Sequence, residues 1–199
     1  SFRFGLGLAL MLALALLARW FGLSLDDVGL ARTTWTRGLR WAAAALGIVA
    51  VAYSVALAIP WTREIFLDRR GDLAIGFPLV EAVVATFVGT VLLEEFAFRG
   101  VLLALVTRLR SVGTAVIVSS LLFGLWHIHT TLGALASNDL ADSGPAQAGA
   151  VAAAVAVTTV GGMLLCGLRL VSGSLVAPLI VHATTNSTAT VSAYVVLAS

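Results

Sequence analysis

Long apolar stretches constrain the fold of this chain more than any other feature. An α-helix needs about 20 mostly apolar residues to cross the hydrocarbon core of a bilayer, and six stretches of the chain approach that length. Charged residues make up 11% of the sequence, whereas an ordinary soluble domain has roughly a quarter. So few charges cannot cover the surface of a soluble globule. The sequence therefore predicts a multi-pass integral membrane protein.

The expected fold class is all-α: a polytopic transmembrane helical bundle with about six spans, in a single integral membrane domain over residues 1–199. Polar or turn-forming residues separate the apolar stretches, with a polar stretch at 24–40, a charged loop at 62–72 and a linker at 129–145. The predicted spans are residues 4–21, 41–59, 77–106, 112–128, 146–170 and 174–197.

The basic residues exclude a nucleic-acid partner and indicate the source of the chain. All 12 basic residues are arginines, scattered without a block that could hold phosphates. The expected surroundings are therefore the lipid bilayer. An arginine-only composition rich in Ala, Val and Gly is typical of GC-rich coding and favours a bacterial cytoplasmic membrane.

Three charged residues lie deep inside the third predicted span: Glu94, Glu95 and Arg99. A charge at the bilayer centre costs roughly 2.5–3.5 kcal/mol on insertion scales, so these groups should face the protein interior. Glu95 and Arg99 are four residues apart on one helix face and can form an ion pair. Glu94 lies about 100° around the helix and has no obvious local partner. A purely structural ion pair needs one acid per base, so the surplus acid indicates chemistry. Glu81, near the start of the span, is not placed in the site.

Polar residues also occur in the fourth and sixth predicted spans. His127 ends the fourth, while His182 and Asn186 share a face of the sixth. His129 points about 200° away from His127 and is expected at the interface, outside the site. Taken singly, each histidine is as readily explained by a structural hydrogen bond. Together with the unpaired Glu94, they indicate an active site.

These residues form three motifs that resemble one known family. The EExxxR motif starts at Glu94, the FxxxH motif spans 123–127 and the HxxxN motif spans 182–186. The set resembles the CAAX protease and bacteriocin-processing (CPBP) family, which includes the type II CAAX prenyl endopeptidases. The stretch 27–32 also resembles the segment before the family's second helix. The motif-bearing protease core covers about 77–195. The resemblance implies an intramembrane peptidase fold with eight helices in fuller members.

The resemblance assigns each matching residue a role in peptide hydrolysis. Glu94 corresponds to the catalytic acid, and Glu95 and Arg99 complete its motif, with Arg99 holding the carboxylates. His127 and His182 are the active-site histidines, and Asn186 is the polar partner of the second; Phe123 is a packing residue. The expected reaction is hydrolysis of a peptide bond in a membrane-associated peptide or protein. Glu94 activates water, His182 and Asn186 support the oxyanion, and His127 holds the water or passes a proton.

Two alternatives stay open at this point, and a third is disfavoured. The favoured mechanism uses no cofactor, but two histidines and a glutamate are also a catalytic zinc ligand set, which would be Glu94, His127 and His182. The chain has no HExxH motif, and Asn is an unusual zinc ligand. A non-proteolytic binding or bacteriocin-immunity protein is the second alternative. Ion transport is disfavoured because the polar residues cluster instead of following a path.

Overall fold

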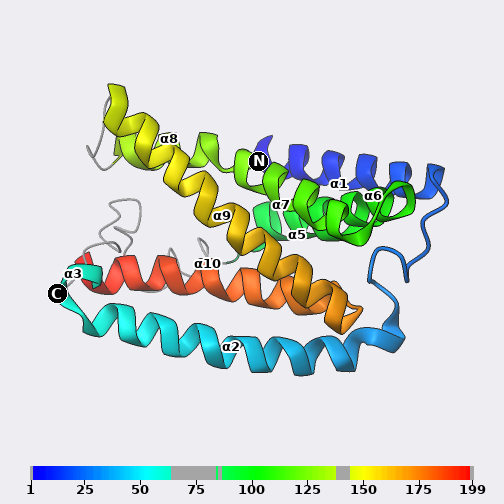
Figure 1. The fold of residues 1–199 in the computed structure, drawn as a ribbon, viewed down its shortest axis with the longest axis horizontal. Helices are drawn as coiled ribbons and strands as arrows, with labels where there is room; N and C mark the ends of the chain where they lie inside the picture. Colours follow the sequence, from blue (N-terminus) through cyan, green and yellow to red (C-terminus); the bar gives the residue numbers. More distant parts are fainter. Residues whose placement is uncertain (1, 64–83, 85–86, 138–143, 198–199) are drawn as a thin grey trace.

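The computed structural model describes residues 2–63, 84, 87–137 and 144–197. Its regular elements are helices, which confirms the predicted all-α class (Figure 1). The elements before the charged motif are α1 (Phe2–Trp20), η1 (Arg32–Thr34), α2 (Trp35–Ala58) and α3 (Pro60–Arg63). The later elements are η4 (Phe87–Val91), α5 (Leu92–Glu95), η5 (Phe96–Leu102), α6 (Leu103–Leu109), α7 (Val112–Trp126), α8 (Ile128–Ser137), α9 (Gly144–Ser172) and α10 (Val176–Leu197).

Helix α9 crosses the bundle obliquely between two groups of helices. Figure 1 shows α2 and α10 side by side along one edge, with α1, α6 and α7 on the other side of α9. The most extensive helix contact is between α7 and α9. Small residues permit it: a Cβ atom at Gly124 would overlap Thr159, and one at Gly162 would lie 3.1 Å from Ser120. Close approach through small residues is a general mode of helix packing in membranes.

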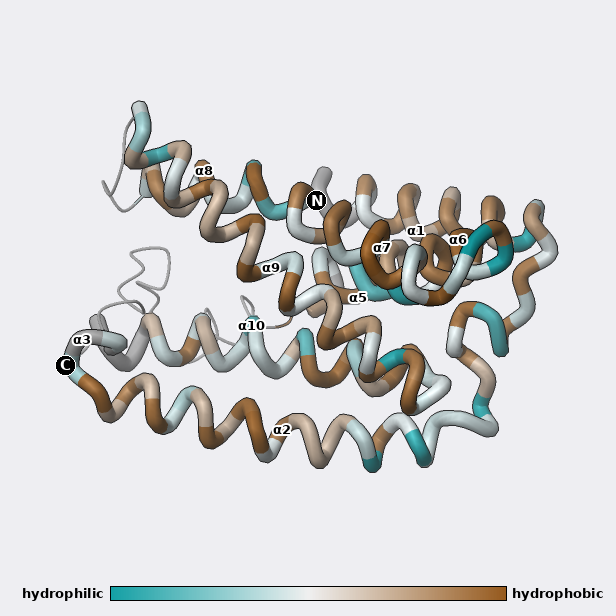
Figure 2. The backbone as a smooth tube through the Cα atoms, in the orientation of Figure 1, coloured by the Kyte–Doolittle hydropathy of each residue, from teal (hydrophilic) through white to brown (hydrophobic). Residues whose placement is uncertain are grey.

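Three helical segments are long and apolar enough to cross a membrane by length and composition: Arg32–Ala58, Val112–Ser137 and Gly144–Ser172. Their outer faces are apolar and exposed, as at Ile48 (74%) and Leu164 (71%), and Figure 2 shows extensive hydrophobic stretches along these helices. Such faces suit contact with acyl chains. The position of α10 agrees with the sixth predicted span, although α10 is not among these three segments. A total of six spans remains a prediction.

The predicted start of the second span was wrong. The prediction starts it at residue 41, whereas α2 begins six residues earlier, at Trp35. The first turns are polar, and contacts with the end of α9 hold them: Nε of Arg37 donates to the carbonyl of Ser172 at 2.6 Å. A cation at a helix C-terminus also interacts favourably with the helix dipole. Hydropathy identifies the apolar part of such a helix and misses a polar start that tertiary contacts stabilise.

The predicted linker at 129–145 was wrong in its first part, because α8 occupies Ile128–Ser137. The hydroxyls of Thr131 and Ser137 donate to carbonyls of the same helical segment, each at 2.8 Å, so these polar residues do not interrupt it. The other predicted span ends in the described regions lie within three residues of the helix ends. Some predicted features lie outside the described residues: the start of span three with Glu81, the loop beyond Arg63, and linker residues 138–143.

The connection between α1 and α2 is held by two arginines from other helices. Arg108 of α6 donates to the carboxylate of Asp27 at 2.8 Å, and Ser24 donates to the same oxygen through its backbone N–H (2.7 Å) and hydroxyl (2.6 Å). Arg169 of α9 donates to the Asp27 carbonyl at 2.8 Å. Gly29, with φ +76°, lies against the Arg169 guanidinium. This connection therefore fastens α1 to α6 and α9.

Replacing Gly29 should destabilise the protein more than replacing another glycine of the same conformation. Gly22→Ala and Gly29→Ala both force a side chain into the left-handed region, which costs about 1–2 kcal/mol. A Cβ at Gly22 meets no atom within 4 Å, whereas one at Gly29 collides with Arg169. Thermal unfolding in detergent should show the larger fall in Tm for Gly29→Ala. Equal losses in the two variants would contradict the packing of Arg169 on Gly29.

Asp27 should make stability depend on pH in the acid range. Hydrogen bonds from Ser24, followed by the charge of Arg108, hold the pKa of Asp27 below its usual value. A lowered folded-state pKa stabilises the protein above the unfolded pKa, about 4, and the contribution disappears as pH falls through the folded pKa. The Tm difference between wild type and Asp27→Asn should therefore be largest near neutrality and shrink below pH 4. A pH-independent difference would contradict this assignment.

Candidate active site

The helix that carries the acidic motif changes its winding around the two glutamates. The π-helical segments η4 and η5 flank α5, which ends with Glu94 and Glu95. Segments of this kind occur frequently at functional sites. Glu94 is 3% exposed, and Glu95 and Arg99 are fully buried. Figure 2 shows this hydrophilic segment at α5, inside the bundle.

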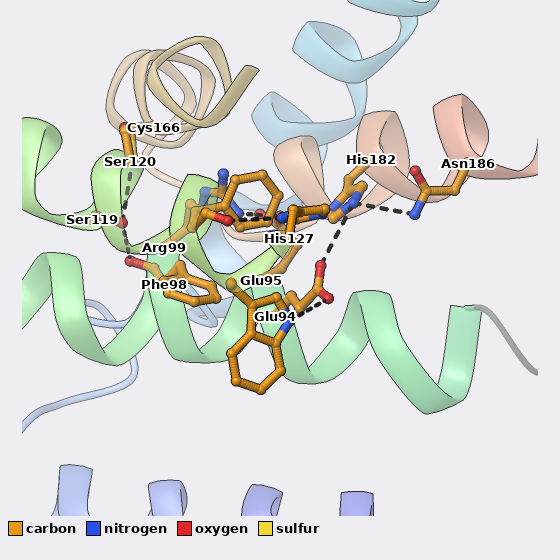
Figure 3. Close-up of polar contacts among 12 residues, drawn as sticks. Glu94, Glu95, Phe98, Arg99, Ser119, Ser120, His127, Cys166, His182 and Asn186 are labelled. Atoms are coloured by element: carbon orange, nitrogen blue, oxygen red, sulfur yellow. Dashed lines mark hydrogen bonds and ion pairs between the residues drawn. The ribbon is translucent and has the colours of Figure 1, made fainter. Parts of the chain in front are cut away.

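Glu95 joins the acidic motif to α10. Nη1 of Arg99 donates to its Oε1 at 2.7 Å, which confirms the predicted ion pair. Nδ1 of His182 lies 2.8 Å from the same oxygen. An ionised carboxylate can only accept hydrogen bonds, so the proton of neutral His182 lies on Nδ1 and Nε2 keeps its lone pair. The Glu95 carboxylate thus fixes both the orientation and the tautomer of His182 (Figure 3).

Glu94 has a partner that the sequence did not indicate. Its Oε1 accepts a hydrogen bond from Nε1 of Trp126 at 2.9 Å. Its Oε2 is buried and has no hydrogen-bond partner among the described residues. That oxygen lies 3.8 Å from Nε2 of His182, with the two groups facing each other in Figure 3. One carboxylate oxygen is therefore fixed by the indole, while the other faces an imidazole nitrogen.

His127 and Asn186 complete the polar cluster. Nδ1 of His127 lies 2.7 Å from the Phe123 carbonyl, and because a carbonyl can only accept, this nitrogen carries the proton and Nε2 of the neutral ring is left with a lone pair. Nδ2 of Asn186 lies 3.3 Å from Nε2 of His182 and donates to it in that tautomer. His127 is partly exposed, and His182 is buried.

Phe123 packs at the centre of the cluster, as its motif implied. The Arg99 guanidinium carbon lies 3.9 Å from the centre of the Phe123 ring, within the range of a cation–π contact. The same ring meets the rings of His127 (4.5 Å between centroids) and His182 (5.6 Å) edge to face. Phe123 thus holds the guanidinium and both imidazoles at fixed distances from one another.

The structure brings the predicted site residues from three helical segments into one cluster. His127 is connected to the others through Phe123. Direct contacts join the remaining five: Glu94, Glu95, Arg99, His182 and Asn186. Trp126, which is 32 positions from Glu94, was not among the predicted site residues. No local spacing rule connects residues so far apart in sequence, and tryptophan near a span end is ordinary in membrane proteins.

A cleft of about 810 Å³ opens beside Glu94 between α1, the η4–α5 segment and α8. His129, which the sequence placed outside the site, lines this cleft and is exposed. The cleft combines apolar side chains, glycines and hydroxyls, so its wall offers both apolar surface and hydrogen-bonding groups. Its lining residues are Leu6, Gly7, Leu10, Gly89, Thr90, Leu93, Glu94, Trp126, His129, Thr130, Gly133 and Ser137.

The zinc alternative fits the cluster only in part. Oε2 of Glu94 has no hydrogen-bond partner among the described residues and faces Nε2 of His182, whose lone pair accepts from Asn186 in the neutral ring. The bond from His182 to Glu95 resembles the carboxylate–histidine arrangement that often supports a zinc ligand. Within the described ranges, however, no three His, Cys, Asp or Glu side chains are placed so that they could hold a metal ion.

Comparison with known proteins gives one finding of similarity. A family model described as type II CAAX prenyl endopeptidase Rce1-like matches residues 76–188, more than half of the chain. The matched range contains all six predicted site residues. Searches of curated proteins and of solved structures found no match.

Losing one partner of the buried Glu95–Arg99 pair should destabilise the protein more than losing both. Arg99→Met keeps an apolar contact with Phe123 but leaves the Glu95 carboxylate without its cation, which costs about 3–5 kcal/mol for a buried pair. Adding Glu95→Gln should recover part of this loss, because the amide is neutral and its oxygen still accepts from His182. Unfolding in detergent measures the difference. A double variant less stable than Arg99→Met would contradict the charge argument.

Proposed function

Because the chain belongs to the Rce1-like family of type II CAAX prenyl endopeptidases, we propose that it is an intramembrane endopeptidase with Glu94 as its general base. Its substrate is a membrane-associated peptide or protein, and the reaction is hydrolysis of one peptide bond. The arginine-only composition favours a bacterial cytoplasmic membrane as its location.

The placement of the free oxygen of Glu94 carries the proposal. Oε2 of Glu94 and Nε2 of His182 are both acceptors and lie 3.8 Å apart. When polar atoms lie farther apart than 3.5 Å, a bridging water is the natural partner. A water placed there donates one hydrogen to Oε2 of Glu94 and the other to Nε2 of His182, where it takes the place of the Asn186 amide that lies 3.3 Å from that nitrogen. Glu94 also lines the cleft, from which a peptide carbonyl would approach this water.

The reaction follows from this placement in two steps. The water oxygen bonds to the peptide carbonyl carbon while Glu94 takes a proton, and the carbonyl oxygen becomes an oxyanion. The amide of Asn186 is the nearby donor for that oxyanion; Nε2 of His182 can donate only when the imidazole is protonated. The C–N bond then breaks as the nitrogen takes the proton from Glu94. His127, through Nε2, holds the water or passes this proton.

Cleavage by purified protein tests the proposal. Wild type and Glu94→Gln in detergent are compared on quenched fluorescent peptides that carry a membrane anchor, each with and without a strong zinc chelator. Removing a positioned general base typically costs about 10²–10⁴-fold in rate, so Glu94→Gln should lose at least 100-fold in kcat/KM. Asp26→Asn, which removes a carboxylate from the connection between α1 and α2, should retain wild-type activity.

Each contrary outcome selects a different alternative. Activity that the chelator abolishes and zinc restores would replace the metal-free mechanism with the zinc mechanism. Full activity of Glu94→Gln would overturn the role of Glu94 in either mechanism. If folded wild type cleaves none of the anchored peptides, the binding or bacteriocin-immunity alternative takes the place of the peptidase.

A further inference from the structure

Trp126 is the hydrogen-bond donor that the structure gives to Glu94. The indole Nε1–H is a donor only, and it lies 2.9 Å from Oε1. The indole ring meets the Phe98 ring edge to face, with 6.2 Å between centroids, and Phe98 meets Phe123 in the same way at 5.4 Å. This row of rings connects the indole to the centre of the cluster and restricts its rotation.

The indole determines which oxygen of Glu94 is free. With Oε1 engaged by Trp126, Oε2 is the oxygen that faces His182. Without this donor, the carboxylate can rotate about its last torsion, which is a broad and nearly two-fold one. The two oxygens would then exchange places, and neither would be held at the position of the attacking water.

The position of Trp126 also connects the carboxylate with the cleft. Trp126 ends α7, one residue before His127, so a single helix end places the donor to Glu94 and one of the two histidines. Trp126 is 51% exposed and lines the cleft together with Glu94. A tryptophan that merely anchors a helix directs its N–H toward the headgroups. This one directs its N–H to a buried carboxylate.

We propose that Trp126 is a positioning residue of the active site. Its indole N–H holds Oε1 of Glu94 so that Oε2 stays on the attacking water, and bound substrate covers its ring in the cleft. The inference rests on the proposed peptidase function, in which Glu94 is the base.

Kinetics of Trp126→Phe test this role. Phenylalanine keeps an aromatic ring in the cleft but removes the N–H together with part of the ring surface, a loss of surface that the control substitution below shares. A hydrogen bond to a charged group that is needed in the transition state predicts a fall in kcat of about tenfold, with KM changed by less than about twofold. Trp35→Phe is the matched control, because Trp35 is similarly exposed and donates to the Leu30 carbonyl, away from the cluster. Its kcat should equal that of wild type.

A second measurement separates this inference from the proposed function. The protein contains five tryptophans, and in protein with ¹⁵N-labelled indoles the resonance missing from Trp126→Phe identifies Trp126. Glu94→Ala removes the acceptor and should move this resonance, while the Trp35 resonance stays in place. If the Trp126 resonance has the same position in wild type and in Glu94→Ala, the proposed contact is overturned, whatever the peptidase activity of the protein.

The kinetic measurements also separate failure of the positioning role from failure of the peptidase function. If wild type cleaves and Trp126→Phe keeps full kcat, the positioning role is wrong and the peptidase function stands. If wild type cleaves nothing, the peptidase function and the positioning role built on it both fail, even where the resonance reports the contact.

Discussion

One carboxylate oxygen of Glu95, Oε1, is bound by both the Arg99 guanidinium and the imidazole of His182. Both charged side chains are fully buried. Burying either charge alone would be costly, so the pair must form as the helices pack. Once formed, it orients His182 and places the proton on Nδ1. The Glu94–His182 geometry depends on this arrangement, because it places Nε2 of His182 3.8 Å from Oε2 of Glu94.

The two adjacent glutamates therefore have different partners, although they share one helical turn. Glu95 is neutralised by Arg99 and organises the site, whereas Glu94 is bound to Trp126. Oε2 of each glutamate is buried without a hydrogen-bond partner among the described side chains, but that of Glu94 faces His182 and Glu94 lines the cleft. This difference is the basis for proposing Glu94 as the general base. The contrast accounts for a surplus acid in an apolar helix, where a purely structural network would need only one.

Local rules predicted some of this and missed the rest for identifiable reasons. Hydropathy located the long helices, and the spacing of four residues predicted the Glu95–Arg99 contact, because both depend on nearby sequence. The polar first turns of α2 were missed because contacts with α9 stabilise them. Helix α8 was missed because its hydroxyl groups donate to carbonyls of their own helical segment and so do not interrupt it. The bond from Trp126 to Glu94 spans two helices, and the tautomer of His182 depends on a third. No pattern within one helix contains that information.

The tautomer of His182 is the most direct test of the arrangement on which the site depends. The chain has three histidines, so ¹⁵N-labelled imidazoles observed by NMR in detergent, with His182→Gln for assignment, can report the protonation of each ring nitrogen. In its neutral form, His182 should carry its proton on Nδ1 and none on Nε2. A neutral ring with the proton on Nε2 and none on Nδ1 would contradict both its hydrogen bond to Glu95 and the acceptor role of Nε2 beside Glu94.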